Sequence, residues 1–175
     1  MKNVRTAIFG ASLVILSAAA PAKMTKTIQL HFGSEPWHLE LSLGGGLKPS
    51  DGPESSPDRQ VYFYEDGQGT VLSVIVENAH EPANIDACRE VFQRRKADIQ
   101  PNDEVQGSRG DAATQEYDWK LDFQAKWVVQ HNVFACRVRG TYYIDVHASK
   151  IPYVPSDHDA LMRWVDAVDV VDSAQ

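Results

Sequence analysis

The sequence predicts an α+β fold, in which two helices pack on a mostly antiparallel sheet of about seven strands. Several segments alternate apolar and polar residues with the period of two that a half-buried strand requires. Gly-containing turns join most of these segments, which favours hairpins and therefore antiparallel pairing. Two other segments repeat apolar residues at helical spacing. The predicted order of elements is β-β-β-β-α-β-β-β-α.

Residues 1–22 carry the three parts of a secretory signal peptide: a basic start, an apolar run and small residues before a cut after Ala22. The apolar run is shorter than the roughly 20 residues that cross a bilayer as a helix. We therefore expect a cleaved leader and a single globular α+β domain over residues 23–175. The mature protein would be periplasmic or secreted and would have no membrane span. A true start at Met24 is the alternative.

The chain is acidic, with 17 Lys and Arg against 24 Asp and Glu. Loss of Lys2 and Arg5 with the leader leaves 15 basic against 24 acidic residues, a net charge of −9 with neutral histidines. Such a surface repels phosphate backbones. The basic cluster at residues 94–96 is typical of a solvated helix face, so we expect no nucleic-acid partner.

The first half of the chain predicts two hairpins. Residues 27–32 and 37–43 alternate as half-buried strands, and residues 60–65 and 70–77 form a second pair. The second pair contains a nearly continuous apolar run, which predicts a strand in the sheet interior. Residues 44–58 are rich in Gly, Pro, Ser and charge, so we expect a flexible surface loop there. Its three consecutive glycines lack the spacing of a phosphate-binding loop.

The first predicted helix begins at Asn84, whose side chain can cap it. Its buried stripe contains Ile85, Cys88, Phe92 and Ile99. A strand over residues 117–123 follows, with one apolar and one polar face.

The last helix is predicted to begin at a capping box formed by Ser156 and Asp159. Its apolar stripe is Leu161, Trp164, Val165 and Val168. We expect Trp164 to be buried against the sheet and to matter more for stability than Trp37, which lies near a strand end.

The two longest strands are predicted within residues 126–149, and a two-residue turn at Arg139-Gly140 would join them. Counting outward from that turn pairs Val138 with Thr141 and His147 with Asn132. One face of this hairpin is apolar and should be core. The other face is mixed, and its polar residues need water or partners.

The strand that ends this hairpin reads Asp-x-His-x-Ser-Lys over residues 145–150. With the element order, this resembles the PsbP type of α/β/α sandwich over roughly residues 60–170. It is also similar to exported bacterial domains of unknown function that carry the same strand. PsbP-type domains serve as accessory and binding modules, so the resemblance implies a binding role without a specific reaction.

Three polar residues, Asp145, His147 and Ser149, share one face of this strand. Residues two apart on a strand lie about 7 Å apart, so the row does not converge as a catalytic triad must. We therefore predict no catalytic residues. Asn132, Asp145 and His147 remain the candidate polar site. His131 should point to the opposite face and should not meet His147.

The six histidines show none of the spacings of a metal-binding motif. The surroundings of His147 and Asn132 are the one place where we expect ligands to be able to gather. We predict no metal ligands and no cofactor-binding residues.

The two cysteines, Cys88 and Cys136, are not arranged as a redox-active pair. In an exported domain they predict a disulfide that closes a loop of about 49 residues and ties the first helix to the hairpin. Two buried free thiols are the alternative.

These observations favour an exported, non-catalytic binding or accessory module of the cell envelope, whose partner is an unknown protein or small ligand. The alternative function is a secreted hydrolase that uses Asp145 and His147.

Overall fold

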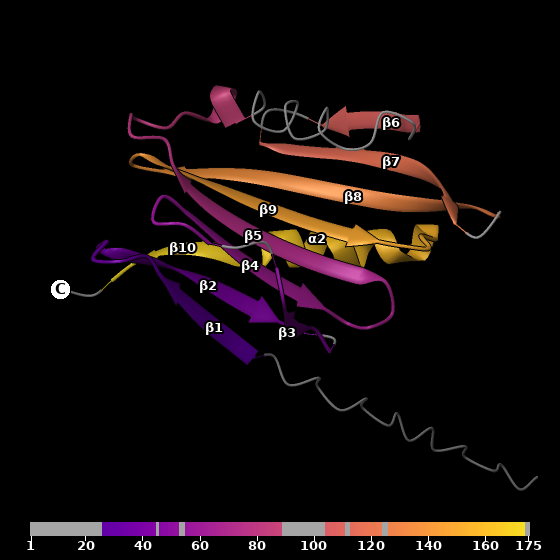
Figure 1. Cartoon of the computed structure of the whole chain (residues 1–175), viewed down its shortest axis with the longest axis horizontal. Coiled ribbons are helices and arrows are strands. Elements are labelled where there is room, and N and C mark those ends of the chain that lie inside the picture. The colour runs from indigo at the N-terminus through magenta and orange to yellow at the C-terminus, as the bar shows by residue number, and fades with distance from the viewer. Residues whose placement is uncertain are drawn as a thin grey trace, which may run out of the picture.

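The computed structural model describes residues 26–44, 46–52, 55–88, 104–110, 113–123 and 126–173. Within these ranges the chain is α+β, with antiparallel sheets of three and seven strands (Figure 1). This confirms the predicted fold class. The predicted leader, residues 1–22, lies outside the described residues and stays a prediction. No helix in the described part is both long and apolar enough to cross a membrane.

The seven-stranded sheet has the order β3-β4-β5-β9-β8-β7-β6, and all its neighbours pair antiparallel. In that order its strands are Lys48–Ser50, Arg59–Glu65, Thr70–Asn78, Tyr142–Lys150, Lys126–Arg139, Thr114–Phe123 and Glu104–Gly110. The apolar run in β5 therefore lies in the sheet interior, as the sequence predicts. The long β8–β9 hairpin lies next to it.

The three-stranded sheet consists of β1 (Lys26–His31), β2 (Trp37–Leu43) and β10 (Val168–Asp172), with β2 in the middle. Its apolar side chains and those of helix α2 (His158–Asp166) pack on one face of the large sheet. This packing forms the main core, which includes Leu39, Leu41, Leu72, Val74, Val133, Ile144, Val146, Leu161, Val165 and Val168. Because β2 alternates with period two, every second side chain enters this core.

Three strands were not predicted from the sequence. β3 lies within residues 44–58, where we expected a flexible loop, and it pairs with β4. β6 pairs with β7, and β10 pairs with β2. We had extended the last helix to Val168, but α2 ends at Asp166 and Val168 begins β10. A five-residue strand is too short for its periodicity to be distinguished from the end of an apolar helix stripe.

The β8–β9 hairpin turns at Gly140-Thr141, one residue later than predicted, because Arg139 pairs with Tyr142. Gly140 has a φ of +60° and occupies the first of the two turn positions. A Gly at the first position is the requirement of a type II′ turn, whereas we had placed it second. Every cross-strand partner shifts by two residues, so His147 lies opposite Phe134 instead of Asn132. A shift of two leaves each side chain on its predicted face.

The start of the last helix also differs from the prediction. A short 3₁₀ helix, η1 (Pro155–Asp157), precedes α2, and the Asp157 carboxylate accepts a hydrogen bond from the Val154 backbone N–H at 3.0 Å. Asp157 therefore makes the contact that we had assigned to the box of Ser156 and Asp159. Because the chain enters through a 3₁₀ turn that begins at Pro155, the capping position lies earlier than the helical pattern indicates.

The expected ranking of the two tryptophans is wrong. Trp164 is half-buried, and the fully buried residues of α2 are Leu161 and Val165. Trp37 is only 3% exposed and belongs to the main core. The position of Trp37 near a strand end did not indicate exposure, because β2 is the central strand of its sheet.

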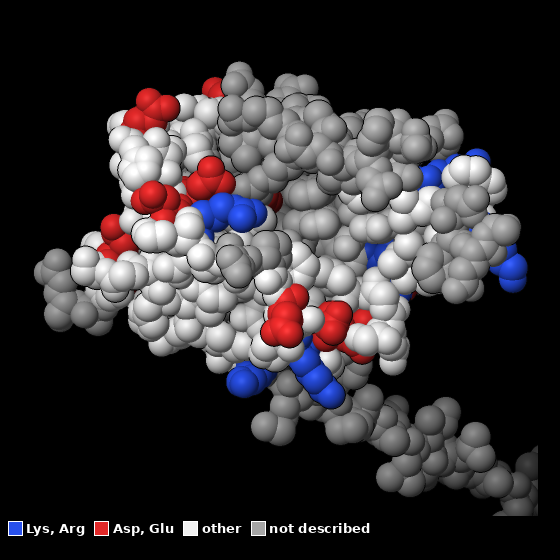
Figure 2. Space-filling view, in the orientation of Figure 1, with Lys and Arg blue, Asp and Glu red and all other residues white. Residues whose placement is uncertain are grey.

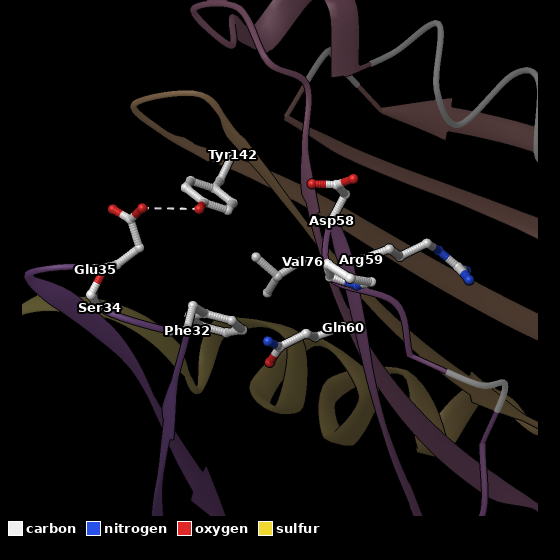
Figure 3. Close-up of a pocket in the computed structure, with 10 residues that line it drawn as sticks. Phe32, Ser34, Glu35, Asp58, Arg59, Gln60, Val76 and Tyr142 are labelled. Carbon is white, nitrogen blue, oxygen red and sulfur yellow. Dashed lines mark hydrogen bonds between the residues drawn. The ribbon is translucent and has the colours of Figure 1, made fainter.

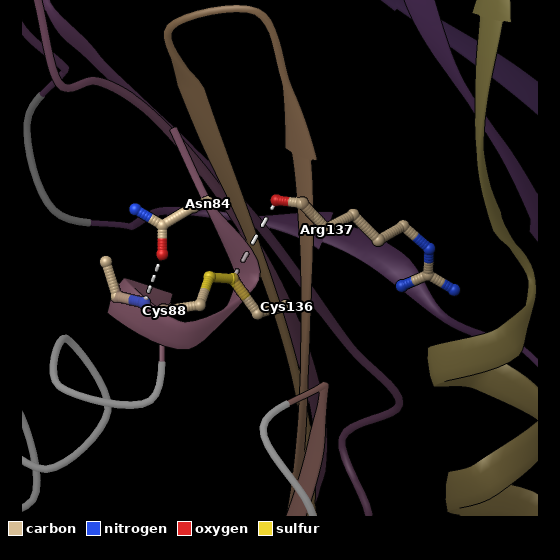
Figure 4. The surroundings of a disulfide bond; sticks show 5 residues. Asn84, Cys88, Cys136 and Arg137 are labelled. Carbon is tan, nitrogen blue, oxygen red and sulfur yellow. Dashed lines mark hydrogen bonds between the residues drawn. A yellow bond between two sulfur atoms is a disulfide. The ribbon is translucent and has the colours of Figure 1, made fainter. Parts of the chain in front are cut away.

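The opposite face of the large sheet carries a second apolar cluster around a disulfide between Cys88 and Cys136, whose Cα atoms are 6.1 Å apart. Residues 85–88 are helical, and the Asn84 Oδ1 accepts the Ala87 backbone N–H at 2.8 Å, as expected of an N-cap. Figure 4 shows the disulfide on one side of β8 and the Arg137 side chain directed to α2 on the other. The rest of the predicted helix, including Phe92 and Ile99, lies outside the described residues.

Candidate functional site

The predicted polar site lies on the disulfide side of the large sheet. Asn132 of β8 is fully buried, and its side-chain oxygen lies 3.0 Å from the Nε2 of His147 on β9. The His147 ring stacks on Phe134, with ring centroids 4.0 Å apart. An amide oxygen only accepts hydrogen bonds, so His147 Nε2 must carry the proton. Because Nε2 is protonated, it has no free lone pair, and His147 cannot act as a general base through that atom.

Asp145 lies two residues from His147 on β9, opposite Cys136 of β8 and Ile75 of β5. It is 4% exposed. Both Asp145 and His147 are therefore held by regular pairing on each side, in a strand where side chains two apart do not converge. This geometry does not support the hydrolase hypothesis. The structure brings His147 and Asn132 together as partners within the sheet.

A surface pocket of about 230 Å³ lies where three segments distant in sequence meet (Figure 3). The turn between β1 and β2 forms one wall, residues 57–60 form the other, and Tyr142 closes the end nearest the β8–β9 turn. The phenol of Tyr142 donates a hydrogen bond to Glu35 at 2.9 Å. Figure 3 shows the side chains of Phe32 and Val76 facing each other at the base, below Glu35 and Tyr142. The pocket thus combines an apolar floor with a polar rim.

The rim of this pocket is acidic. Burial raises the pKa of Tyr142, and the hydrogen bond to Glu35 and the charges of Glu35 and Asp58 raise it further. The guanidinium of Arg59 points away from Tyr142 in Figure 3. Figure 2 shows acidic side chains gathered at the end of the molecule that carries the β8–β9 turn, which is the end where the pocket lies. The lining thus contains two carboxylates, of Glu35 and Asp58, and one guanidinium, of Arg59, and His80 lies 3.5 Å from Asp58.

A second hollow of about 330 Å³ adjoins the first and shares Glu35 and Tyr142 with it. It is lined by Pro36, Trp37 and the turn residues 139–141. The Tyr142–Glu35 hydrogen bond therefore joins the two residues that line both hollows.

Another group of polar side chains lies on the α2 side of the sheet, where Glu116 of β7, His131 of β8 and His158 of α2 meet. One ligand atom from each lies within 4.8 Å of the others, which is close enough to hold a metal ion. The Nδ1 of His131 lies 2.5 Å from the Asp118 carboxylate. Asp118 faces His131 directly in the β7–β8 register.

Comparisons with known proteins find no matching family model and no matching curated protein. Among solved structures, the chain is similar to the Ran-binding protein Mog1p of Saccharomyces cerevisiae, with a TM-score of 0.46 and 15% identity over 86% of this chain and 97% of that one. It is also similar to LpqN of Mycobacterium tuberculosis, which is involved in cell envelope biogenesis, with a TM-score of 0.39 and 10% identity over 86% of this chain and 92% of LpqN. Neither likeness bears on what this chain binds.

Sequence reasoning missed both the pocket and the Glu116, His131 and His158 cluster. Part of the cluster had a sequence signal: pairing Phe123 with Lys126 and counting outward places Asp118 opposite His131. The contact with His158 had none, because it depends on where α2 lies on the sheet. The pocket likewise depends on three turns that only the tertiary structure brings together.

Proposed function

We propose that the chain is an exported, non-catalytic binding module of the cell envelope, and that its pocket receives a lysine or arginine side chain of a partner protein. The observation that carries this proposal is the arrangement of Glu35 and Asp58 around the apolar floor of the pocket. The contacting atoms of the occupant would be an ammonium or guanidinium group.

The chemistry of the pocket matches a long basic side chain. Such a side chain has an apolar stem and a charged end, so its stem can cover apolar surface while its head stays near water. Phe32 and Val76, which are 4% and 2% exposed, form the apolar base of the pocket, and the carboxylates of Glu35 and Asp58 supply the charge. The ring of Tyr142 adds an aromatic face at the same end, and aromatic faces attract cations.

Location in the envelope rests on the signal-like residues 1–22. A net charge of −9 increases the association rate with basic partners. The resemblance to PsbP-type accessory domains supports the same kind of role. We propose no reaction, because His147 and Asp145 of the polar site are held within the sheet.

The proposal can be tested with a short lysine-rich peptide as the probe. Its binding is monitored by NMR, from the chemical shifts of the backbone amides of the protein. We expect shift changes concentrated at Glu35, Asp58 and Tyr142, and weaker binding at higher salt. Replacing both Glu35→Gln and Asp58→Asn should weaken binding about tenfold or more, since hydrogen bonds to charged groups contribute about 1.5–3 kcal/mol each.

The matched control is Glu65→Gln, which removes one negative charge at an exposed position of β4 outside the pocket. It should leave the peptide affinity within about twofold, because isolated surface charges contribute little. If Glu65→Gln weakens binding as much as the pocket variants do, the peptide is held by net charge alone and the proposed pocket is wrong.

Native mass spectrometry of the protein purified from the exported fraction then tests the physiological role. We expect a retained protein partner that is lost from the Glu35→Gln and Asp58→Asn double variant. Accumulation of the full-length chain in the cytoplasm as the main form would refute export.

A further inference from the structure

The start of α2 meets β7 and β8 at a cluster of side chains that can coordinate metal. Glu116 and Asp118 lie two residues apart on β7, and both face the same side as His131 on β8. His158 is the first residue of α2. Three elements from different parts of the chain therefore converge on one point, on the opposite side of the sheet from the pair His147 and Asn132.

His131 is held in one orientation. It is 4% exposed, its ring stacks on Tyr153 with centroids 4.4 Å apart, and its Nδ1 lies 2.5 Å from Asp118. Because a carboxylate accepts the hydrogen bond, Nδ1 carries the proton in the neutral ring and Nε2 keeps its lone pair. A carboxylate bonded to the far nitrogen is the arrangement that orients histidine ligands at zinc sites.

The Nε2 of His131 is buried and has no hydrogen-bond partner within the described part of the chain. It faces the Glu116 carboxylate at 3.4 Å. In the neutral ring, a lone pair facing a carboxylate oxygen is repulsive unless a cation lies between them. Buried polar atoms of this kind are rare in folded proteins and often indicate an unseen partner.

The distances from the Glu116 carboxylate to the two imidazole nitrogens suit a tetrahedral ion, and all three ligand atoms lie within 4.8 Å of one another. Zn–N and Zn–O bonds of about 2.0–2.1 Å at tetrahedral angles place neighbouring ligand atoms roughly 3.3 Å apart. The Glu116 Oε2 lies 3.4 Å from His131 Nε2 and 3.0 Å from His158 Nε2. The other nitrogen of His158 lies 3.6 Å from the exposed Asp159 carboxylate, which is too long for a hydrogen bond, so of the two rings Asp118 orients only that of His131.

Other charges around the cluster are compatible with a cation. Asp118 and Asp159 add negative charge behind the two imidazoles. Lys150 pairs with His131 from β9, but its ammonium donates to the Gln68 carbonyl at 2.6 Å and lies 3.9 Å from Asp66. That ammonium is thus bound in the turn between β4 and β5.

We propose that Glu116, His131 and His158 bind a divalent transition-metal ion, with Zn²⁺ as the expected ion. Two imidazoles and one carboxylate form a recognised three-ligand set for zinc, and the fourth position is filled by water or by a ligand. The His158 side chain is 30% exposed, so the open position faces solvent on that side. The ion would tie the start of α2 to β7 and β8. This site does not depend on the proposed pocket.

The test uses untagged protein stripped with a chelator and titrated with ZnCl₂ in a calorimeter. We expect binding of one Zn²⁺ per chain. At free Zn²⁺ about 100-fold above the dissociation constant, the melting temperature should rise by roughly 5–10 °C. MgCl₂ should have no effect, because Mg²⁺ prefers an octahedral set of oxygen ligands. Co²⁺ substitution should give the intense visible absorption of a four-coordinate site.

Two variants locate the ion. Glu116→Gln keeps the shape of the side chain but removes its charge, and His158→Ala removes a partly exposed ligand with little effect on the core. Each should lower the Zn²⁺ affinity at least tenfold, and circular dichroism should show that each remains folded. The control is His80→Asn, which removes an exposed imidazole outside the cluster; asparagine tolerates the φ of +59° at that position.

The proposal is overturned if the wild-type protein binds Zn²⁺ no better than millimolar. It is also overturned if Glu116→Gln and His158→Ala bind as tightly as the wild type, because the ion would then lie elsewhere.

Discussion

The burial of Trp37 predicts that Trp37→Ala is more destabilising than Trp164→Ala. The Trp37 ring packs on Phe32 and Tyr142, with ring centroids 5.0 and 5.3 Å away, and it is 3% exposed. A buried tryptophan removes roughly 200 Å² from water, or about 5 kcal/mol at 25 cal/mol per Å², as an upper bound. Measured losses for buried Trp→Ala are about 3–5 kcal/mol, which we expect for Trp37. For the half-buried Trp164 we expect about 1–2 kcal/mol.

The assay is urea unfolding followed by far-ultraviolet circular dichroism, because tryptophan fluorescence would itself change in these variants. The control is Trp37→Phe, which keeps an aromatic ring against Phe32 and Tyr142 and should lose less than half as much stability as Trp37→Ala. Equal m-values would show that the unfolding transition is unchanged. If Trp164→Ala shifts the midpoint more than Trp37→Ala does, the packing of the small sheet on the large one is not as described.

Three further predictions concern the disulfide, the pH dependence and the leader. Intact mass of the unreduced protein should show no alkylatable thiol, and the paired change of Cys88 and Cys136 to Ala should cost about 4 kcal/mol in the chain-entropy model; two alkylated thiols would contradict the bond. Burial and the neighbouring charges raise the pKa of Tyr142 above its ordinary 10.0, so its contribution is complete below pH 10 and is lost as the pH rises through the folded-state pKa. The stability difference between wild type and Tyr142→Phe should therefore shrink in strongly alkaline urea titrations, and a constant difference would contradict it. Amino-terminal sequencing of the exported protein should begin at Lys23, and a start at Met1 would disprove cleavage.

Local pattern was sufficient to predict which face of a strand is buried, but not which residues face each other. Ile144 and Val146 were placed on the core face by alternation alone, and both are fully buried. Their partners were wrong by two residues, because the register depends on whether Gly140 takes the first or second position of the turn. A type I′ turn at Arg139-Gly140 would need a positive φ at Arg139, whereas a type II′ turn at Gly140-Thr141 needs one only at Gly140. The turn chemistry therefore favours the observed register, and this was the signal that the prediction missed.

Short edge elements were the least predictable part of the fold. β3 and β10 have three and five residues, too few for a period of two to be recognised. β10 exists because it pairs with β2, and that pairing depends on where α2 directs the chain. Backbone hydrogen bonds between distant segments decided its structure, and local apolar spacing did not.

The sequence by itself determined the fold class, the buried faces of the long strands, the capping of the first helix by Asn84 and the acidic charge of the surface. Each of these depends on neighbouring residues or on composition. The tertiary structure alone decided the candidate sites. Tyr142 and Glu35 are 107 residues apart, and His158 and Glu116 are 42 residues apart. Contacts at such separations depend on how complete sheets and helices pack, because no local periodicity relates the residues that form them.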